Sequence, residues 1–443
     1  MKKYTIAVAI IGLFFSPFFI SAGWLKTYGG DEYDWGKCVH QTPVGDYIVV
    51  GTTKSFGSGD QDLWLLKTAE NGDTQWTRTF GDSERNKGYC VDLTNDGGFI
   101  ASGNSGLYKF NSADVLEWQN TYAAFFVQQT EDNGYILSAT SNQRIWLIKM
   151  DENGDTIWTS TLSRGVGYCV QETSDGGYIV AGEIWEDTVG GPLDDLFIIK
   201  TDAQGNEQWS KAYWGISTGS GKFVQETFDS NYIVTGNYDG LDLCVLKIDK
   251  DGGTIWERVY AQGNGGNGTC IQQTSDSGFV LVGSWWTTVG NEPRSWLLKL
   301  DPWGDTLWTR IFSSQISEGK FVEQTSDKGF IVTGEIDNPP GFNSELLLIK
   351  TDSMGYVAVE EETPVLESDW YLGESIGRQI NLHYTNCPQG FQAEVFDASG
   401  RKINEIRSHL PSATISWGGC CEPGVYFIKP VTDNRVQKVV LIK

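Results

Sequence analysis

The stretch SDGGYIVAGE, residues 174–183, decides the fold because the chain repeats it. In each copy a polar segment containing Asp or Gly precedes a run of β-branched and aromatic residues. Gly adopts positive φ easily and Asp accepts hydrogen bonds from its own backbone, so SDGG predicts a tight turn. Residues 178–180 are then expected in the core. The stretch is interpreted as a hairpin unit of the fold. Near-copies are NDGGFIASGN (95–104), SDSGFVLVGS (275–284) and SDKGFIVTGE (326–335).

A tryptophan that recurs every 40 to 52 residues marks seven copies of a longer unit. In the fourth copy the unit contains WTSTL (158–162), GYCVQET (167–173), GYIVAGE (177–183) and LFIIKTD (196–202). Four strand-like segments in each of seven units predict an all-β fold, a seven-bladed β-propeller with four-stranded blades over residues 24–356. The repeated tryptophans are Trp24, Trp76, Trp118, Trp158, Trp209, Trp256 and Trp308.

A second turn precedes each of these tryptophans except the first, as in KTDAQGNEQW, residues 200–209. Its Asp and Gly predict a hairpin between the third and fourth strands, which leaves the tryptophan to pack between blades. Closure of a propeller further predicts that the strand at Trp24 pairs with residues 345–350. A lysine recurs in every copy, which favours an architectural role because a single ligand site would break the symmetry. These lysines are Lys67, Lys109, Lys149, Lys200, Lys247, Lys299 and Lys350.

The pattern VQQTxDGGYIVxG resembles the SBBP-type β-propeller repeats of secreted bacterial proteins, and DxxGxxxW is similar to the tryptophan-docking turn of quinoprotein propellers. The resemblance covers roughly residues 24 to 355 and implies the propeller fold. Quinoprotein dehydrogenases place paired vicinal cysteines beside their cofactor. The only vicinal pair here, Cys420–Cys421, lies outside the repeats, which argues against that activity.

The N-terminal residues predict an export signal. Lys2 and Lys3 precede an apolar run over residues 5–20, and small residues follow at 21–23. This is the layout of a secretory signal peptide, so residues 1–23 are interpreted as one, with cleavage after Ala22 or Gly23. The mature chain is expected to be secreted, extracellular or on the outer cell surface, without a transmembrane segment.

Net charge restricts the partners. Acidic residues outnumber basic ones 57 to 33, giving a formal net charge of −24. Phosphate backbones and anionic lipids repel such a chain, so nucleic acid is excluded as an expected partner.

The C-terminal part has a different pattern. Residues 357–370 are acidic and predict a linker, and the alternation of apolar residues over 371–443 predicts a small β-sandwich. AEVFDASGRKI (393–403), GVYFIK (424–429) and KVVLIK (438–443) resemble the C-terminal sorting domain of the type IX secretion system. The resemblance implies that the type IX machinery is a partner and that the protein crosses an outer membrane. An ordinary sandwich domain used for binding is the alternative.

The cysteines divide into two groups. Cys38, Cys90, Cys169 and Cys270 occupy a position that holds Phe in the other copies, which predicts buried free thiols in the core. In the tail, Cys387 could form a disulfide with Cys420 or Cys421, as an exported location allows.

Variable loops suggest a ligand face. The loops after the second and fourth strands should share one face of the propeller, and they carry aromatic residues that suit contact with carbohydrate or protein. Capping of blade edges is an equally good interpretation of these residues. The candidates are Trp35, Trp185, Asp187, Trp214, Trp285, Trp286 and Arg294.

No catalytic, cofactor-binding or metal-binding residue is predicted. Calcium could be held by Asp31, Asp34, Asp194 and Asp195, although no loop has EF-hand spacing. The function expected from these features is non-catalytic binding of a glycan or protein. The alternatives are a polysaccharide-active enzyme with carboxylates on the loop face and a structural surface-layer protein.

Overall fold

The structure is a computed structural model in which strands are the regular elements of the described residues. These are 23–186, 193–213, 219–238, 242–260, 265–287, 292–312, 315–338, 343–357, 369–372, 376–385, 391–408, 413–419, 421–430 and 437–442. The chain divides into two units, Met1–Ala358 and Val359–Lys443. In the described ranges no helix is long and apolar enough to cross a membrane.

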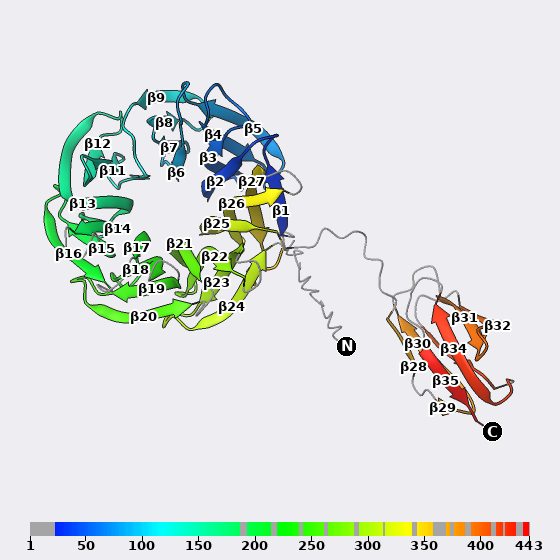
Figure 1. Cartoon of the computed structure of the whole chain (residues 1–443). Helices are drawn as coiled ribbons and strands as arrows, with labels where there is room; N and C mark the ends of the chain where they lie inside the picture. The colour runs from blue at the N-terminus through cyan, green and yellow to red at the C-terminus, as the bar shows by residue number, and fades with distance from the viewer. Residues whose placement is uncertain are drawn as a thin grey trace, which may run out of the picture. The chain divides into compact units, whose positions relative to one another are not determined.

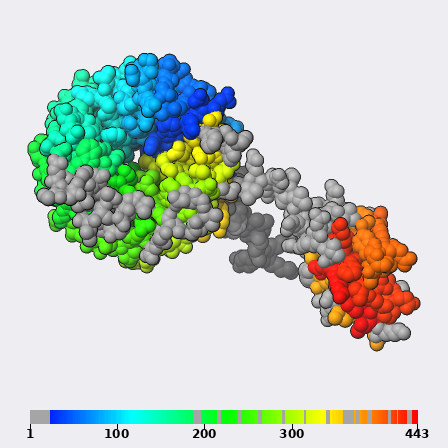
Figure 2. Space-filling model, in the orientation of Figure 1, coloured from blue at the N-terminus to red at the C-terminus, as the bar shows by residue number. Residues whose placement is uncertain are grey.

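Small antiparallel sheets follow one another around a ring in the first unit (Figure 1), and side chains fill most of the space between the ribbons (Figure 2). One sheet contains β2 (Asp34–Gln41), β3 (Tyr47–Thr53), β4 (Asp62–Thr68) and β5 (Thr74–Phe80). The next contains β6 (Gly88–Leu93), β7 (Phe99–Gly103), β8 (Leu107–Phe110) and β9 (Leu116–Asn120). The ring of four-stranded sheets is a β-propeller.

The remaining sheets repeat this order. One contains β17 (Ser220–Glu226), β18 (Tyr232–Tyr238), β19 (Asp242–Ile248) and β20 (Thr254–Tyr260). Another contains β21 (Gly266–Gln273), β22 (Phe279–Trp286), β23 (Pro293–Leu300) and β24 (Thr306–Phe312). The last contains β25 (Ser317–Gln324), β26 (Phe330–Asn338), β27 (Asn343–Thr351) and β1 (Trp24–Tyr28).

One strand belongs to two neighbouring sheets. β10 (Phe126–Gln129), β11 (Tyr135–Ser141) and β12 (Arg144–Met150) pair on to β13 (Thr156–Glu172), which continues into β14 (Tyr178–Glu186), β15 (Leu193–Thr201) and β16 (Glu207–Tyr213). The sequence predicted two separate segments within β13, and this boundary was wrong. Pairing passes from β12 at Arg164 to β14 at Gly165, whose N–H donates to the Gln143 carbonyl at 3.0 Å, so no loop separates the halves.

The predicted closure of the ring is confirmed. β1 pairs antiparallel with β27, and Trp24 lies opposite Lys350. The same junction is joined at its inner strands, where His40 of β2 contacts Glu323 of β25. Burial lowers the pKa of His40, but Glu323 outweighs it and raises that pKa to about 9. The N-terminal strand is therefore paired within the last sheet, and an ion pair joins that sheet to the first.

The SDGG turn has the predicted geometry. The Gly176 N–H donates to the Thr173 carbonyl at 2.8 Å, and Asp175 accepts from the Thr173 hydroxyl at 2.6 Å and the Gly177 N–H at 3.0 Å. Gly176 has a φ of 78°. Residues 178–180 are at most 2% exposed. The stretch is confirmed as a hairpin turn followed by a strand that is buried in the core.

The recurring lysine is explained by an ion pair within each sheet. Lys200 is 2% exposed, and its Nζ donates to Asp175 at 3.0 Å and to the Thr201 carbonyl at 2.9 Å. A buried ammonium group needs such partners because it has lost its water. The equivalent pairs are Lys109–Asp96, Lys149–Asp132, Lys247–Asp229, Lys299–Asp276 and Lys350–Asp327. The lysine is architectural, as the sequence predicted.

The first sheet departs from this rule and compensates. Val44 stands where the other copies have the turn Asp, so the first turn offers Lys67 no carboxylate at that position. Lys67 pairs instead with Asp114 of the next sheet at 2.8 Å. Asp114 replaces the turn glycine of that sheet at a φ of 59°, and it also accepts from Trp76 Nε1 at 3.0 Å. One residue thus satisfies the lysine and docks the tryptophan.

Each repeated tryptophan packs on the second turn of the following sheet, as predicted. A Cβ added to Gly205 would lie 2.5 Å from the Trp158 ring, so the glycine permits the contact. Trp209 Nε1 also donates to the Lys250 carbonyl at 3.0 Å. The other ring-to-glycine contacts are Trp24–Gly72, Trp118–Gly154, Trp209–Gly252, Trp256–Gly304 and Trp308–Gly355.

Polar residues at the ends of the inner strands join neighbouring sheets. Gln129 accepts from the Asn95 N–H at 2.7 Å, while the Gln129 N–H donates to Asp92 at 2.7 Å. The same exchange links Gln128, Glu172 and the Glu131 N–H. The VQQT-type motif therefore supplies hydrogen bonds from sheet to sheet.

The second unit has two sheets around one apolar core. β28 (Asp369–Leu372), β30 (Ile380–Thr385) and β33 (Ala413–Trp417) form the first. β29 (Ile376–Gly377), β35 (Gln437–Leu441), β34 (Gly424–Pro430), β31 (Phe391–Asp397) and β32 (Lys402–Ser408) form the second. Leu382 and Tyr384 from one sheet share the core with Phe391 and Ile428 from the other.

We expect Gly205→Ala to destabilise the protein more than Gly176→Ala. Both glycines have similar positive φ, 76° and 78°, so each substitution costs about 1–2 kcal/mol of backbone strain. Only Gly205 is against a tryptophan, whereas Gly176 has nothing within 4 Å of an added Cβ. The free energy of unfolding, measured by urea denaturation, should fall by at least about 1 kcal/mol more for Gly205→Ala. Equal losses would show that tryptophan docking contributes nothing.

We expect the first unit to lose stability in acid. Burial raises the pKa of Asp175, but hydrogen bonds from Thr173, Gly177 and Lys200 outweigh it and leave that pKa below its ordinary value. A carboxyl group whose pKa is lowered by folding stabilises the folded state at pH values above its ordinary pKa. This stabilisation is lost as the pH falls below about 5 toward the folded-state pKa. Asp175→Asn should cost about 1–2 kcal/mol at pH 7, a value reduced because the carboxylate is 56% exposed. The difference from the parent should shrink in urea titrations at pH 3. A difference independent of pH would contradict the assignment.

Candidate binding cavity

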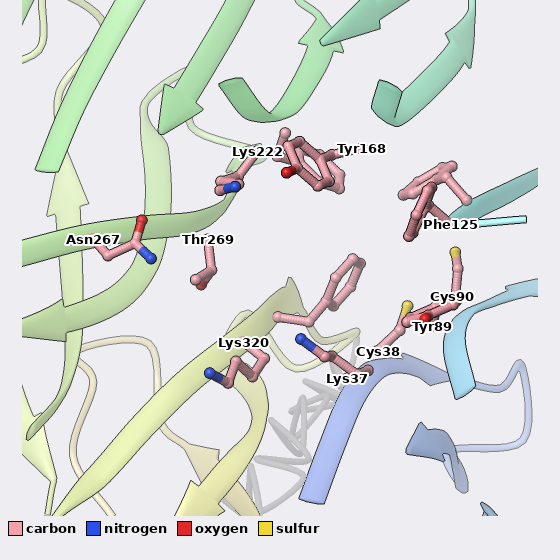
Figure 3. Close-up of a pocket in the computed structure, with 13 residues that line it drawn as sticks. Lys37, Cys38, Tyr89, Cys90, Phe125, Tyr168, Lys222, Asn267, Thr269 and Lys320 are labelled. Carbon is pink, nitrogen blue, oxygen red and sulfur yellow. The ribbon is translucent and has the colours of Figure 1, made fainter. Parts of the chain in front are cut away.

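A cavity of about 310 Å³ lies between the inner strands of the ring. Its wall is made by β2, β6, β13, β17, β21 and β25 and by the residues at the start of β10. Figure 3 shows the side chains of these strands arranged around a common open space. The lining residues are Lys37, Cys38, Tyr89, Cys90, Phe125, Phe126, Tyr168, Lys222, Phe223, Asn267, Thr269, Lys320 and Phe321.

A β-bulge places one side chain of each of six inner strands in the wall. In β2, Gly36 lies opposite Gly51 and Cys38 opposite Val50, so Lys37 is an extra residue without a partner. Bulges redirect a side chain and are frequent beside functional sites. The equivalent extra residues are Tyr89, Tyr168, Lys222, Thr269 and Lys320.

The residue before the bulge is glycine because the neighbouring sheet is close. A Cβ on Gly36 would lie 2.1 Å from Thr333 Oγ1 of β26. The residue after the bulge is Cys or Phe, and it is buried. Cys38, Cys90, Cys169 and Cys270 are at most 2% exposed, which confirms the predicted buried free thiols.

Three lysines contribute positive charge to the wall. Lys320 pairs with Glu318 at 2.5 Å and Glu335 at 3.0 Å. Lys222 Nζ lies 3.8 Å from the centre of the Tyr168 ring and has no carboxylate within ion-pair distance among the described residues. In the same part of the chain, Lys37 makes neither a hydrogen bond nor an ion pair. Two of the three ammonium groups are thus available to a ligand.

Burial controls the protonation of these groups. Burial and the positive charge of Lys320 together lower the pKa of Lys37 to about 8, although Glu335 and Glu318 oppose them. Burial also lowers the pKa of Lys222. For Lys320 the same burial effect is outweighed by Glu335 and Glu318, which raise its pKa. Of the three cavity lysines, Lys37 is therefore the one whose positive charge costs the folded state the most free energy.

Aromatic rings occupy another part of the wall. Tyr89 and Phe125 have ring centres 5.2 Å apart, and Phe125 and Tyr168 have ring centres 6.1 Å apart. The three residues come from consecutive sheets. Burial raises the pKa of Tyr89, so its hydroxyl stays protonated at neutral pH. The rings offer apolar surface with hydroxyl groups at its edge.

Two polar side chains complete the wall. Thr269 Oγ1 donates to the Gly319 carbonyl at 2.9 Å. Asn267 Oδ1 is buried and has no hydrogen-bond partner among the described residues. An unsatisfied buried acceptor costs free energy, so a donor from a ligand would stabilise the folded chain.

None of the predicted ligand-face residues is among those that line the cavity, and two of the described ones lie close to lining residues in sequence or strand register. Trp35 precedes Lys37 by two residues on β2, and Trp285 of β22 pairs with Gly266, next to Asn267. Trp285 also lies opposite Arg294, which pairs with Glu292 at 2.7 Å.

The other candidates are more separate. Trp185 donates to Glu183 at 3.2 Å on β14, and the Trp286 N–H donates to the Gly265 carbonyl at 3.2 Å. Asp187 and Trp214 lie outside the described residues.

The calcium and disulfide predictions remain untested. Among the described residues no cluster of three or more His, Cys, Asp or Glu side chains is placed to hold a metal ion. Asp34 uses its carboxylate within the protein, accepting from the Gly30 N–H at 2.8 Å and the Ser55 hydroxyl at 2.6 Å. The side chains of Asp194 and Asp195, like Cys387 and Cys420, lie outside the described part, and Cys421 packs beside the second core.

Sequence analysis missed the bulge residues. Their signal is a position in the repeated pattern G-x-C/F-V/I where the copies differ in charge and size while the flanking residues stay uniform. Such variation inside an architectural motif indicates a surface that the architecture does not constrain.

Comparison with known proteins finds only distant structural likenesses. No protein-family model and no curated protein sequence matches the chain. Drosophila plexin A in complex with semaphorin 1b is 8% identical, with a TM-score of 0.45, over 75% of this chain and 88% of that chain. Kluyveromyces lactis Hsv2 is 8% identical, with a TM-score of 0.43, over 72% and 99%. A Bacteroides caccae protein of unknown function is 10% identical, with a TM-score of 0.42, over 59% and 93%. At these values the likenesses carry no argument about function.

We expect Lys37→Met to stabilise the protein at neutral pH. The folded state lowers the pKa of Lys37 from 10.5 to about 8, so below pH 8 the charge is present in both states and its full cost remains. Between pH 8 and 10.5 the folded state loses the proton first, and the cost disappears. The gain should be about 1–3 kcal/mol at pH 7 and should shrink toward pH 10.5. The exposed Lys250 supplies the control Lys250→Met. Thermal unfolding that shows no gain at pH 7 would contradict this account.

Proposed function

We propose that this protein is a secreted or cell-surface binding protein that takes a glycan or protein ligand at the central cavity and the surrounding strand ends. The observation that carries the proposal is the wall of bulge residues, which varies in an otherwise uniform repeat. Among the thirteen lining residues there is no His, Asp or Glu, the types that supply paired acid and base groups in glycoside hydrolysis. This composition supports non-catalytic binding.

The propeller is proposed to have seven blades, counted as the seven repeats, with β13 shared between two of them. The two sheets around one core support a small β-sandwich for the second unit. We propose that this sandwich is a type IX sorting domain and that residues 1–23 are a signal peptide. Their support is the sequence resemblance and the charged and apolar pattern at the N-terminus.

Retention of the full chain on immobilised polysaccharides and cell-surface proteins tests the binding role. Trp285→Ala should weaken retention about tenfold, because aromatic residues at the centre of an interface often contribute more than 1 kcal/mol. Trp303 is 68% exposed on a turn at the opposite ends of the strands, so Trp303→Ala is the matched control.

New reducing ends are measured in the same samples. Retention without cleavage supports the proposal. Cleavage of a polysaccharide would overturn the non-catalytic role, and equal effects of the two tryptophan substitutions would place the ligand elsewhere. Because Trp285 packs against the core, Trp285→Phe and thermal unfolding separate loss of contact from loss of stability.

A further inference from the structure

The cavity concentrates positive charge in a chain whose net charge is −24. Lys222, Lys320 and Lys37 come from β17, β25 and β2, strands of three different sheets. Glu318 and Glu335 pair with Lys320, which leaves Lys37 and Lys222 without an ion-pair partner among the described residues. A buried ammonium group is costly unless it is paired, so an anion in the cavity would offset that cost.

The aromatic part of the wall indicates the shape of the uncharged part of the ligand. Tyr89, Phe125 and Tyr168 face the same space as the lysines, as Figure 3 shows. Their ring faces favour a flat or ring-shaped group that buries apolar surface. A bare inorganic anion would leave this surface uncovered.

The unpaired acceptor selects for hydroxyl groups. Asn267 Oδ1 is buried, Asn267 lines the cavity, and no donor to this oxygen is found in the part of the chain that the structure describes. A carboxylate cannot supply a hydrogen, but a sugar hydroxyl can donate to the amide oxygen and satisfy it. The volume of about 310 Å³ is at the low end for ligand pockets, roughly 300–1,000 Å³, and suits one ring.

We propose that the cavity binds one acidic sugar residue, a hexuronic acid, as part of a glycan. Its carboxylate lies between Lys37 and Lys222, its ring packs on Tyr89, Phe125 and Tyr168, and one hydroxyl donates to Asn267 Oδ1. This assignment rests on the proposed binding function and names the class of ligand. Lysine suits this role because an ammonium group binds a carboxylate as a point charge without requiring the fixed geometry of arginine.

Calorimetry on the full chain tests the assignment with matched probes. Cellobiouronic acid and cellobiose differ by one carboxylate, and digalacturonic acid and α-1,4-galactobiose differ by two. At least one acid should bind, and its neutral counterpart should bind about tenfold more weakly or not at all, since it lacks the charged hydrogen bonds to the lysines. Inorganic phosphate and 4-hydroxybenzoate should bind more weakly than that acid.

Variants locate the contacts. Lys37→Met and Lys222→Met should each weaken binding of the acidic disaccharide about tenfold or more, and Asn267→Ala should weaken it several-fold. Lys250→Met, which removes an exposed lysine, should leave binding unchanged. Because Lys37→Met is expected to be more stable than the parent, its loss of binding cannot be attributed to unfolding.

Three outcomes would overturn the assignment. They are equal binding of acid and neutral sugars, tighter binding of phosphate or 4-hydroxybenzoate, and absence of uronate binding. If uronates fail while another glycan or a protein is retained through Trp285, the ligand class is wrong and the binding function stands. If nothing is retained, both are wrong.

Discussion

The contact between a tryptophan of one sheet and a turn of the next is the interaction on which the ring depends. No sheet can cover both of its own faces, so each needs a neighbour, and the indole is the largest apolar group that can fill the outer part of each junction. Trp158 requires a residue without a side chain beneath it, which Gly205 provides. The one exception, Asp114 beneath Trp76, keeps the contact by adding a hydrogen bond. The inner parts of several junctions are held instead by Gln, Glu and Asp side chains that bond to the backbone of the neighbouring sheet.

These junctions fix the inner strands firmly enough that their bulges can carry variable residues. Gly36 lies close to Thr333 of the neighbouring sheet, and Cys38 is buried in the core. Because both neighbours of Lys37 are fixed in this way, the Lys37 side chain is directed into the cavity. Burying the ammonium groups of Lys37 and Lys222 costs free energy, and the packing of the surrounding sheets offsets this cost. A cavity built in this way can change its ligand preference by substitution at single positions, without disturbing the strands that hold it.

The sequence predicted the parts of the fold that follow local rules. The SDGG turn, the tryptophan turn and the buried cysteines recur at fixed positions, and the pairing of Trp24 with residues at 345–350 follows from closure of a repeated unit. Lys67 and Asp114 could not be matched, because their contact depends on which sheets are neighbours. The cavity was missed because the bulge at Lys37 is a property of strand register, set by Gly36 opposite Gly51. Trp35 and Trp285 were predicted on a loop face from loop length, whereas the structure places them on β2 and β22.

The pairing of β1 with β27 has a consequence for how the molecule reaches its final form. It joins Trp24 to Lys350, residues more than 300 positions apart, and so carries a larger loop-closure entropy than the hairpins within a sheet. Contacts between such distant segments form slowly, so the hairpins should assemble first and the ring should close last. Until β27, residues 343–351, has been synthesised, β1 has no strand with which to pair. An open, curved row of sheets is therefore expected to precede the closed ring.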